Sequence, residues 1–255
     1  MDSPEAERPR EGFAEEVIAR ARSNGRDSSM RFAAEAFLES SIEPRYSYNF
    51  SWLGRPIIQY PQDIIAMQEL IWAVKPDLII ETGIAHGGSL VFSASMLAIN
   101  AACGGPPDAR VLGMDIEIRP GNRQAIEAHP MFSRISMIEG SSIDPGVIEQ
   151  VRTAARSANR VLVSLDSSHT HAHVLAELNA YAPLTTPGSY CVVFDTIIED
   201  LPATAFPDRE WGKGNNPRTA VREYLNTHPE FEVDELIDNR LLISVAPGGY
   251  LKRVR

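Results

Sequence analysis

Acidic residues follow four of the five apolar segments that we expect to be strands. They are Glu81, Asp115, Asp166 and Asp195. The carboxyl ends of parallel strands meet at one edge of an open α/β sheet, and ligands bind at that edge. Carboxylates are costly to bury without a partner. The four acids together therefore predict a site for a ligand with amines, hydroxyls or a metal ion, although any one of them alone could simply cap a turn.

Three histidines lie close behind Asp166. They are His169, His171 and His173, in a chain that has six histidines. His169 could act as a general base, because imidazole changes charge near neutral pH. Asp166 and Asp195 suit Mg²⁺, which prefers oxygen ligands and keeps waters for a substrate. Two alternatives stay open: an iron site of His and Asp ligands, and a His173 that only begins the next helix.

A glycine-bearing turn follows the first of these strands. It reads Glu81-Thr82-Gly83-Ile84-Ala85-His86-Gly87-Gly88-Ser89. Its glycines let the backbone turn tightly and approach a ligand, and we expect Ser89 to cap the following helix. The turn lacks a strict G-x-G-x-x-G pattern, holds no Lys or Arg for a pyrophosphate, and precedes Asp115 by more than the usual ~20 residues. These features favour a nucleoside without phosphate, such as S-adenosylmethionine, over a dinucleotide; an ordinary strand-to-helix turn is the alternative.

The elements that position these residues alternate between strand and helix. Strands are expected over 78–80, 110–114, 135–138, 161–165 and 189–194, with a closing pair over 231–233 and 241–245. Helices are expected over 14–21, 30–38, 61–74, 90–99, 122–128, 147–155, 173–181 and 219–227. This order predicts an α/β fold: a Rossmann-like, doubly wound, mainly parallel seven-stranded sheet with helices on both faces and an N-terminal helical extension.

We expect two parts along the chain. Residues 1–60 would form an N-terminal extension and a cleft-covering segment, and residues 61–255 the Rossmann-like domain. Partial disorder is expected before residue 14, because that stretch is charged and contains prolines; an extension that faces a partner is the alternative. The aromatic-rich segment 45–60 would cover the ligand cleft or, alternatively, pack on the flank of the domain. The basic tail 252–255 is expected to fray.

Composition excludes several classes of protein. The formal net charge of −10 argues against nucleic-acid binding, which needs a basic face. Cys103 and Cys191 are the only cysteines, so a disulfide framework is not expected. No segment approaches the roughly 20 apolar residues of a membrane span, and the N-terminus has no apolar signal core. We expect a cytoplasmic protein without a membrane partner.

Several motifs together resemble one known family. They are Trp52-Leu53-Gly54-Arg55-Pro56-Ile57-Ile58-Gln59, Pro61-Gln62-Asp63, Glu81 to Ser89, Gly113-Met114-Asp115-Ile116, Leu165-Asp166-Ser167-Ser168-His169 and Val193-Phe194-Asp195-Thr196. Over residues 45–250 the chain resembles the cephalosporin hydroxylase (rhamnosyl O-methyltransferase) family. The resemblance implies a class I methyltransferase fold that binds S-adenosylmethionine and usually Mg²⁺.

The resemblance also implies roles for individual residues. Asp166 and Asp195 match metal ligands, and His169, with Asp166, matches the catalytic group. After strand 189–194 only Asp195 is acidic, so Thr196 would supply a weaker oxygen ligand, or Glu199 or Asp200 would reach in instead. The residues expected at the cofactor are Glu81, Gly83, His86, Gly87 and Ser89 at the amino-acid end, Asp115 at the ribose, Ile116, Ser141 and Ser142 at the adenine, and Asp166.

The resulting expectation is an S-adenosylmethionine-dependent O-methyltransferase. It would be assisted by a divalent metal and would act on a hydroxyl of a sugar or natural product, as a homo-oligomer. The glycine-rich segment 211–216 is expected to be a lid, or else a plain surface connection. Two other functions stay open: a non-catalytic subunit that binds S-adenosylmethionine for a partner enzyme, and an iron-dependent hydroxylase.

Overall fold

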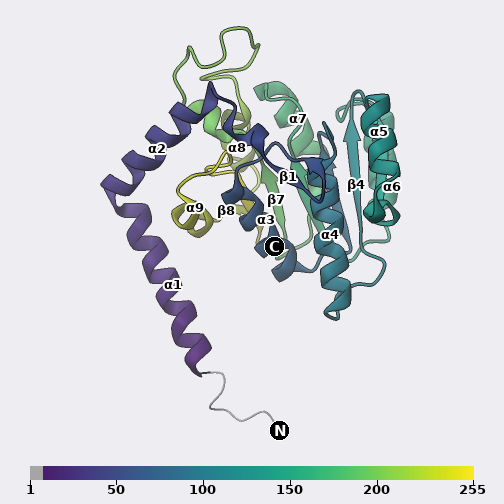
Figure 1. Cartoon of the computed structure of the whole chain (residues 1–255), viewed down its shortest axis with the longest axis horizontal. Coiled ribbons are helices and arrows are strands. Elements are labelled where there is room, and N and C mark those ends of the chain that lie inside the picture. The colour runs from purple at the N-terminus through teal and green to yellow at the C-terminus, as the bar shows by residue number, and fades with distance from the viewer. Residues whose placement is uncertain (1–7) are drawn as a thin grey trace.

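The computed structural model describes residues 8–255 and builds them around one twisted sheet between layers of helices (Figure 1). The strands are β1 (Ser51–Trp52), β2 (Arg55–Pro56), β3 (Leu78–Thr82), β4 (Arg110–Asp115), β5 (Ile135–Glu139), β6 (Val161–Leu165), β7 (Tyr190–Val193), β8 (Phe231–Val233) and β9 (Tyr250–Arg253). The α-helices are α1 (Arg8–Arg26), α2 (Ser28–Ile42), α3 (Pro61–Val74), α4 (Gly88–Ala102), α5 (Pro120–Glu127), α6 (Pro145–Ala155), α7 (His171–Tyr181), α8 (Pro217–Leu225) and α9 (Glu235–Leu241). Short 3₁₀ helices are η1 (Tyr46–Asn49), η2 (Pro130–Arg134), η3 (Ala182–Leu184) and η4 (Thr196–Glu199).

The main sheet has seven strands in the order β5-β4-β3-β6-β7-β9-β8. β3 pairs in parallel with both β4 and β6, while β9 runs antiparallel between β7 and β8. The chain therefore winds one way from β3 to β5 and the other way from β6 onward. The crevice between β3 and β6 is the switch point at which such sheets bind ligands.

Apolar side chains of alternating strand residues fill the two faces of the sheet. Ile79 packs with α3 and α4 on one face, while Leu78 and Ile80 pack with α6, α7 and α8 on the other. This follows from the two-residue period of a strand. Covered on both faces, the central strands β3 and β6 are completely buried. The predicted doubly wound α/β fold is confirmed.

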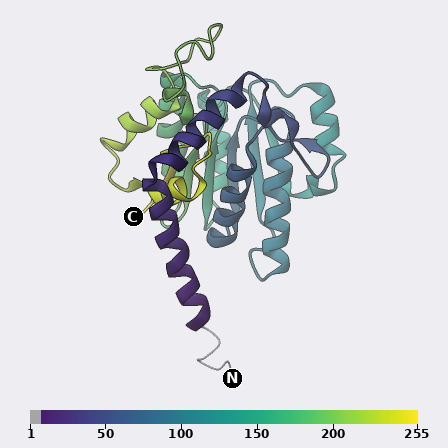
Figure 2. The same ribbon diagram turned by 60° about the vertical axis from the view of Figure 1, so that its left-hand side comes forward.

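The N-terminal helices form the predicted extension. α1 packs along α9, and α2 turns back over the body, where Leu38 joins Tyr60, Ile197 and Leu201 in a small apolar cluster. Figure 2 shows the two helices running along one side of the sheet. The helix expected over 14–21 is thus part of a longer α1. The disorder expected before residue 14 falls partly on residues outside the described range.

Three local expectations were wrong. Residues 241–245 form no strand: α9 ends at Leu241, and the last strand of the chain is β9 at 250–253, which lies between β7 and β8. An apolar segment alone does not reveal whether its backbone pairs with a neighbour, and here the amide of Val245 donates to Asp63 instead. The basic tail is ordered as far as Arg253, since Lys252 and Arg253 pair with β7 and β8. Ser89 does not cap α4, because the helix begins at Gly88 with Gly87 at its N-cap.

Candidate active site at the carboxyl edge of the sheet

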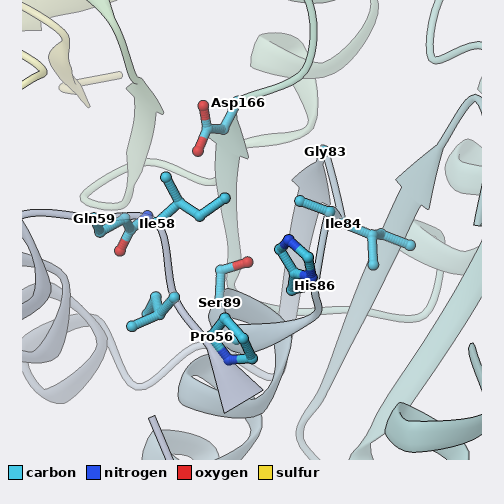
Figure 3. Close-up of a pocket in the computed structure, with 11 residues that line it drawn as sticks. Pro56, Ile58, Gln59, Gly83, Ile84, His86, Ser89 and Asp166 are labelled. Carbon is cyan, nitrogen blue, oxygen red and sulfur yellow. The ribbon is translucent and has the colours of Figure 1, made fainter. Parts of the chain in front are cut away.

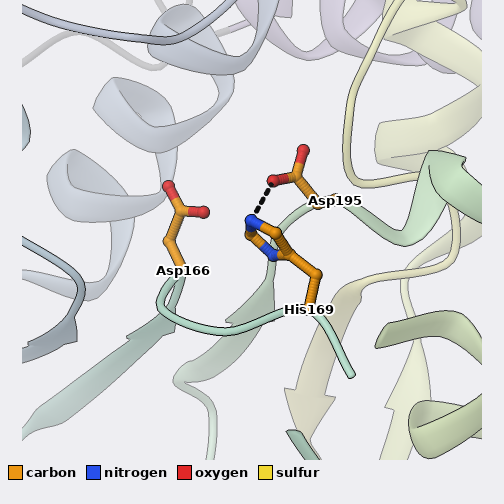
Figure 4. A group of neighbouring side chains, drawn as sticks. All are labelled: Asp166, His169 and Asp195. Atoms are coloured by element: carbon orange, nitrogen blue, oxygen red, sulfur yellow. Dashed lines mark ion pairs between the residues drawn. The ribbon is translucent and has the colours of Figure 1, made fainter. Parts of the chain in front are cut away.

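Three side chains meet where β6 and β7 end. Asp166, His169 and Asp195 each offer a ligand atom, and these atoms lie within 4.8 Å of one another (Figure 4). His169 Nε2 lies 3.2 Å from Asp195 Oδ2. We call these three residues the Asp-His-Asp group. The sequence prediction that Asp166 and Asp195 lie side by side on neighbouring loops agrees with this geometry.

Local backbone structure holds the two aspartates in place. The amide of Asp166 donates to the carbonyl of Thr82 at 3.0 Å, so β6 stays paired with β3 as far as the acid. Asp195 takes a left-handed conformation, with φ of 57°, two residues after the end of β7. Such a conformation is uncommon for a residue with a side chain. It ends the strand and starts η4, which leaves the Asp195 carboxylate beside His169.

The electrostatics of the Asp-His-Asp group favour a cation. Burial raises the pKa of Asp166 well above its usual value, and the negative charges of Asp195, Glu81, Glu177 and Asp63 raise it further. Several like charges in a poorly solvated place are unfavourable unless a positive charge offsets them. Two carboxylates and an imidazole are a donor set that a hard divalent cation can use. The residues present therefore fit a metal of this kind.

The histidines near Asp166 have different partners. His171 bonds through its ring to Thr219 and Glu223 of α8, at 2.8 and 3.1 Å. His173 lies 2.9 Å from the Ser142 hydroxyl and 3.5 Å from the buried Glu177. Neither belongs to the group that includes Asp166 and Asp195. His169 alone of the three is placed to exchange a proton with a ligand there.

The glycine turn passes directly beside Asp166. Gly83 has φ of +89°, and a Cβ on it would lie 1.9 Å from the Asp166 carbonyl oxygen, so a larger residue would not fit. Asp115 Oδ2 accepts hydrogen bonds from the amides of Ile84 and Ala85, at 2.8 and 3.1 Å. Asp115 thus holds the turn, and its Oδ1 accepts a longer bond from Glu117 at 3.2 Å.

Glu81 is a buried carboxylate at the end of β3. Its side chain is 3% exposed, and its Oε1 atom has no hydrogen-bond partner in residues 8–255. Burial raises its pKa to about 7, although the hydroxyls of Ser89 and Ser93 oppose this. An orphaned carboxylate oxygen is costly. An ammonium group of a ligand would satisfy it.

A small pocket opens between the glycine turn and the segment that precedes α3 (Figure 3). Of the predicted cofactor residues, Gly83, His86, Ser89 and Asp166 line it. The sequence did not single out the residues of the facing wall, Pro56, Ile57, Ile58 and Gln59, although it predicted that segment 45–60 covers the cleft. One signal for these residues was available in the sequence: they belong to the motif Trp52 to Gln59, which carries part of the family resemblance.

The residues expected at the adenine lie at the neighbouring strand ends. Ser141 and Ser142 follow β5, and Ile116 follows β4 with 75% of its surface exposed. Ser142 is buried, and its hydroxyl faces His173. An exposed isoleucine at this edge would be covered by a flat apolar ligand. The involvement of these three residues in cofactor binding stays a prediction.

The alternatives for a further metal ligand are engaged elsewhere. Thr196 is completely buried and donates its hydroxyl hydrogen to the Pro247 carbonyl at 2.8 Å, so we do not place it among the metal ligands. Glu199 accepts from the amide of Gly214 and the side chain of Asn216. Asp200 pairs with Arg218. These three side chains therefore bind protein partners and hold the surrounding loops, rather than binding a cation.

Loop 202–216 lies next to the Asp-His-Asp group. The Trp211 ring meets the His169 ring edge-on, with centroids 5.1 Å apart, and Phe206 packs on Trp211 at 4.6 Å. This loop rises at the top of Figure 1. The lid expected over 211–216 stays a prediction, as does the alternative of a plain surface connection.

Comparison with known proteins identifies the family. The family described as Rhamnosyl O-methyltransferase/CmcI matches residues 44–254. The chain belongs to this family. It is 29% identical to the Rhamnosyl O-methyltransferase of Mycobacterium bovis BCG over 238 residues, which cover 87% of this chain and 90% of that protein. The protein of the same name from Mycobacterium leprae is 29% identical over 205 residues, 80% of this chain and 82% of the relative.

Solved structures agree with the fold. A structure of CmcI with Mg and SAM has a TM-score of 0.55 and 20% identity, covering 82% of this chain and 78% of that one. An O-methyltransferase from Bacillus cereus in complex with SAH has a TM-score of 0.50 and 14% identity, covering 79% and 82%. The family resemblance and the class I methyltransferase fold are therefore confirmed. Within residues 8–255, no helix has the length and apolar character that crossing a bilayer requires.

Proposed function

We propose that this chain is an O-methyltransferase that uses S-adenosylmethionine and a divalent cation to methylate a hydroxyl of a sugar or natural product. The observation that carries the proposal is the Asp-His-Asp group, which lies beside the pocket of the glycine turn at one sheet edge. The names of the relatives support methyl transfer to a rhamnosyl hydroxyl.

Two groups of residues would bind the cofactor and the cation at opposite ends of the site. Glu81 and the turn from Gly83 to Ser89 would hold the amino-acid end of S-adenosylmethionine. Asp166 and Asp195 would hold the cation through carboxylate oxygens. When bound, S-adenosylmethionine supplies a methyl group on positively charged sulfur, and the cation withdraws charge from the acceptor oxygens.

His169 is the proposed general base. With the imidazole hydrogen on Nε2, which faces Asp195, the other ring nitrogen, Nδ1, would take the proton of the acceptor hydroxyl while the oxygen forms its bond to the methyl carbon and the carbon–sulfur bond breaks. The products are the methyl ether, S-adenosylhomocysteine and a proton on His169. Asp195, 3.2 Å from Nε2, stabilises the imidazolium that results. Trp211, whose ring meets the His169 ring edge-on, would limit the access of water to the imidazole. The protein mainly has to align the hydroxyl oxygen, methyl carbon and sulfur.

The test combines binding and turnover. Calorimetry with S-adenosylhomocysteine should show binding to the wild type and to Asp195→Asn. Electron paramagnetic resonance of Mn²⁺ should show binding to the wild type and at least about tenfold weaker binding to Asp195→Asn, since half of the carboxylate pair is lost. Transfer of labelled methyl to methyl α-L-rhamnopyranoside should require Mg²⁺ and stop with EDTA. A wild type that does not bind S-adenosylhomocysteine contradicts the proposal.

The two alternative functions predict different results. An accessory subunit would bind S-adenosylhomocysteine without transferring a methyl group to any sugar. A hydroxylase would consume O₂ with Fe²⁺. Non-haem iron oxygenases commonly use two histidines and one carboxylate, whereas the Asp-His-Asp group offers one histidine and two carboxylates. The donor set therefore favours methyl transfer.

A further inference from the structure

The segment from Pro56 to Gln59 forms the wall of the pocket opposite the glycine turn. Figure 3 shows Ile58 and Gln59 across from Ile84 and His86. The segment is fixed from both sides: Ile57 and Tyr60 are buried in the core, and the amide of Ile57 donates to the carbonyl of Phe50 at 3.0 Å. A Cβ on Gly88 would lie 2.1 Å from the Pro56 carbonyl oxygen, so this wall lies directly on the start of α4.

Gln59 is a largely buried residue whose amide reaches the pocket. The residue is 7% exposed, its amide atoms are not among the fully enclosed ones, and no side-chain hydrogen bond of Gln59 is found within residues 8–255. Buried polar side chains are nearly always hydrogen-bonded. A primary amide offers two donors and one acceptor. The free N–H donors of Gln59 therefore indicate a ligand group that accepts hydrogen bonds from them.

The opposite side of the pocket is the N-terminus of α4. Gly87 at the N-cap provides no side-chain cap, and Gly88 and Ser89 of the first turn both line the pocket. The first amides of a helix have no acceptor within the helix, and the helix dipole is positive there. A carboxylate placed between this helix end and the Gln59 amide would receive hydrogen bonds from both sides.

The size of the pocket fits one end of a ligand. It encloses about 50 Å³. A water molecule needs roughly 10–15 Å³ by the same measure, so the space holds a few water-sized groups. That is about the size of an amino-acid carboxylate with its neighbouring atoms.

We propose that Gln59 is a cofactor-binding residue that donates its amide hydrogens to the carboxylate at the amino-acid end of S-adenosylmethionine. The inference rests on the proposed function and extends it. The cofactor site then does not end at the glycine turn, because the segment before α3 supplies the second wall. Glu81 would receive the ammonium group of the same amino-acid end.

Two ligands separate this role from a purely structural one. S-adenosylhomocysteine carries the amino-acid end, and 5′-methylthioadenosine lacks it. Calorimetry is run with both on the wild type, Gln59→Ala and Gln59→Glu. Gln68→Ala is the control, because Gln68 is a partly exposed glutamine of α3 that does not line the pocket. Binding of 5′-methylthioadenosine also shows that each variant is folded.

We expect Gln59→Ala to weaken the binding of S-adenosylhomocysteine about ten- to a hundredfold, the effect of losing a hydrogen bond to a charged group. Gln59→Glu should weaken it more, because it adds a negative charge beside a carboxylate. The affinity for 5′-methylthioadenosine should stay within about twofold of the wild type in both variants.

Four results would overturn the inference. Unchanged S-adenosylhomocysteine affinity in the Gln59 variants removes the contact, and equal losses for both ligands assign Gln59 a role in shaping the pocket only. A wild type that binds both ligands equally shows that the amino-acid end adds no affinity. In these three cases the proposed function survives. A wild type that binds neither ligand removes the proposed function as well.

Discussion

His169 is the residue whose role most depends on its immediate neighbours. It contacts Asp195 through Nε2 and Trp211 through its ring edge. As the general base, it should be more important for turnover than for binding. We predict that His169→Ala lowers kcat by about 10² to 10⁴, the usual contribution of a positioned base, while S-adenosylhomocysteine affinity stays unchanged.

Mn²⁺ titration distinguishes a base from a ligand at this position. His169→Ala should retain Mn²⁺ affinity close to that of the wild type, in contrast to Asp195→Asn. If the two variants lose the metal equally, His169 is a ligand and another group takes the proton. His171→Ala is the matched control, because His171 pairs with α8 and lies outside the Asp-His-Asp group.

Glu81 links pH, stability and cofactor binding. Burial raises its pKa from 4.5 to about 7. The folded protein thus holds the proton of the Glu81 carboxyl more tightly than the unfolded chain does. The resulting contribution to the free energy of unfolding is complete below pH 4.5 and is lost as the pH rises through about 7. The shift corresponds to at most about 3 kcal/mol.

Glu81→Gln should therefore raise the free energy of unfolding of the ligand-free protein well above pH 7 and change it little near pH 4.5. The same variant should bind S-adenosylhomocysteine more weakly, since it lacks the charge that would pair with the ammonium group. Urea denaturation at both pH values and calorimetry measure the two effects. The exposed Glu117, changed to Gln, should show neither. A destabilised Glu81→Gln at high pH would contradict this account.

At the scale of the elements, loop 202–216 depends on one acid at its base. Glu199 in η4 accepts from the amide of Gly214 at 2.8 Å and from the Asn216 side chain at 2.5 Å. The bond from Gly214 is the largest cause that lowers the pKa of Glu199 below its usual value; the Asn216 bond and the nearby Arg222 and Lys213 lower it further, whereas burial opposes the shift. This anchor is thus present above the usual pKa of a glutamate and is lost as the pH falls through the lowered value.

We predict that Glu199→Ala speeds amide hydrogen exchange in 202–216 and lowers methyl transfer, because Trp211 no longer rests on His169. A loss of about tenfold in kcat/KM would be in keeping with removal of two hydrogen bonds at a charged group. Glu210→Ala provides the control, since Glu210 is exposed on the same loop and its side chain forms no bond in residues 8–255. Unchanged exchange in Glu199→Ala would show that the loop is held by its aromatic contacts alone.

For the molecule as a whole, Asp63 joins the start of the domain to its end. This completely buried carboxylate at the start of α3 accepts from Ser244 Oγ, the Val245 amide and the Tyr250 hydroxyl, at 2.6, 3.0 and 2.8 Å. The carbonyl of Val245 in turn accepts from the amide of Ile197, two residues after Asp195. Strand β9 and the loop that carries Asp195 therefore share one buried anchor.

Asp63→Ala should destabilise the protein by about 3 kcal/mol or more, because it leaves three buried donors without an acceptor. Tyr250→Phe removes only one donor of the network and should cost about 1 kcal/mol. The free energy of unfolding in urea measures both. If Asp63→Ala costs no more than Tyr250→Phe, the anchor is not what holds β9 in place.

Much of the fold follows from the sequence because its signals are local. Short β-branched segments such as Leu78–Ile80 and the acids that end them predicted the order of the parallel strands and the edge at which the site forms. The prediction failed at 241–245, where an apolar segment forms the end of α9 and a loop. Whether such a segment pairs as a strand depends on a partner far away in the sequence, and no local pattern reports that.

The residue types that reach the sheet edge can be read from the sequence: acids after β3, β4, β6 and β7, and His169 behind Asp166. How each of them is used depends on the packing of the folded chain. Thr196 bonds to Pro247, His171 to α8 and Asp115 to the glycine turn, whereas Gln59 is left facing the pocket. The physical reason is that a polar side chain satisfies whichever partner folding brings within hydrogen-bond distance. Which polar groups stay open to a ligand is therefore a property of the packed chain.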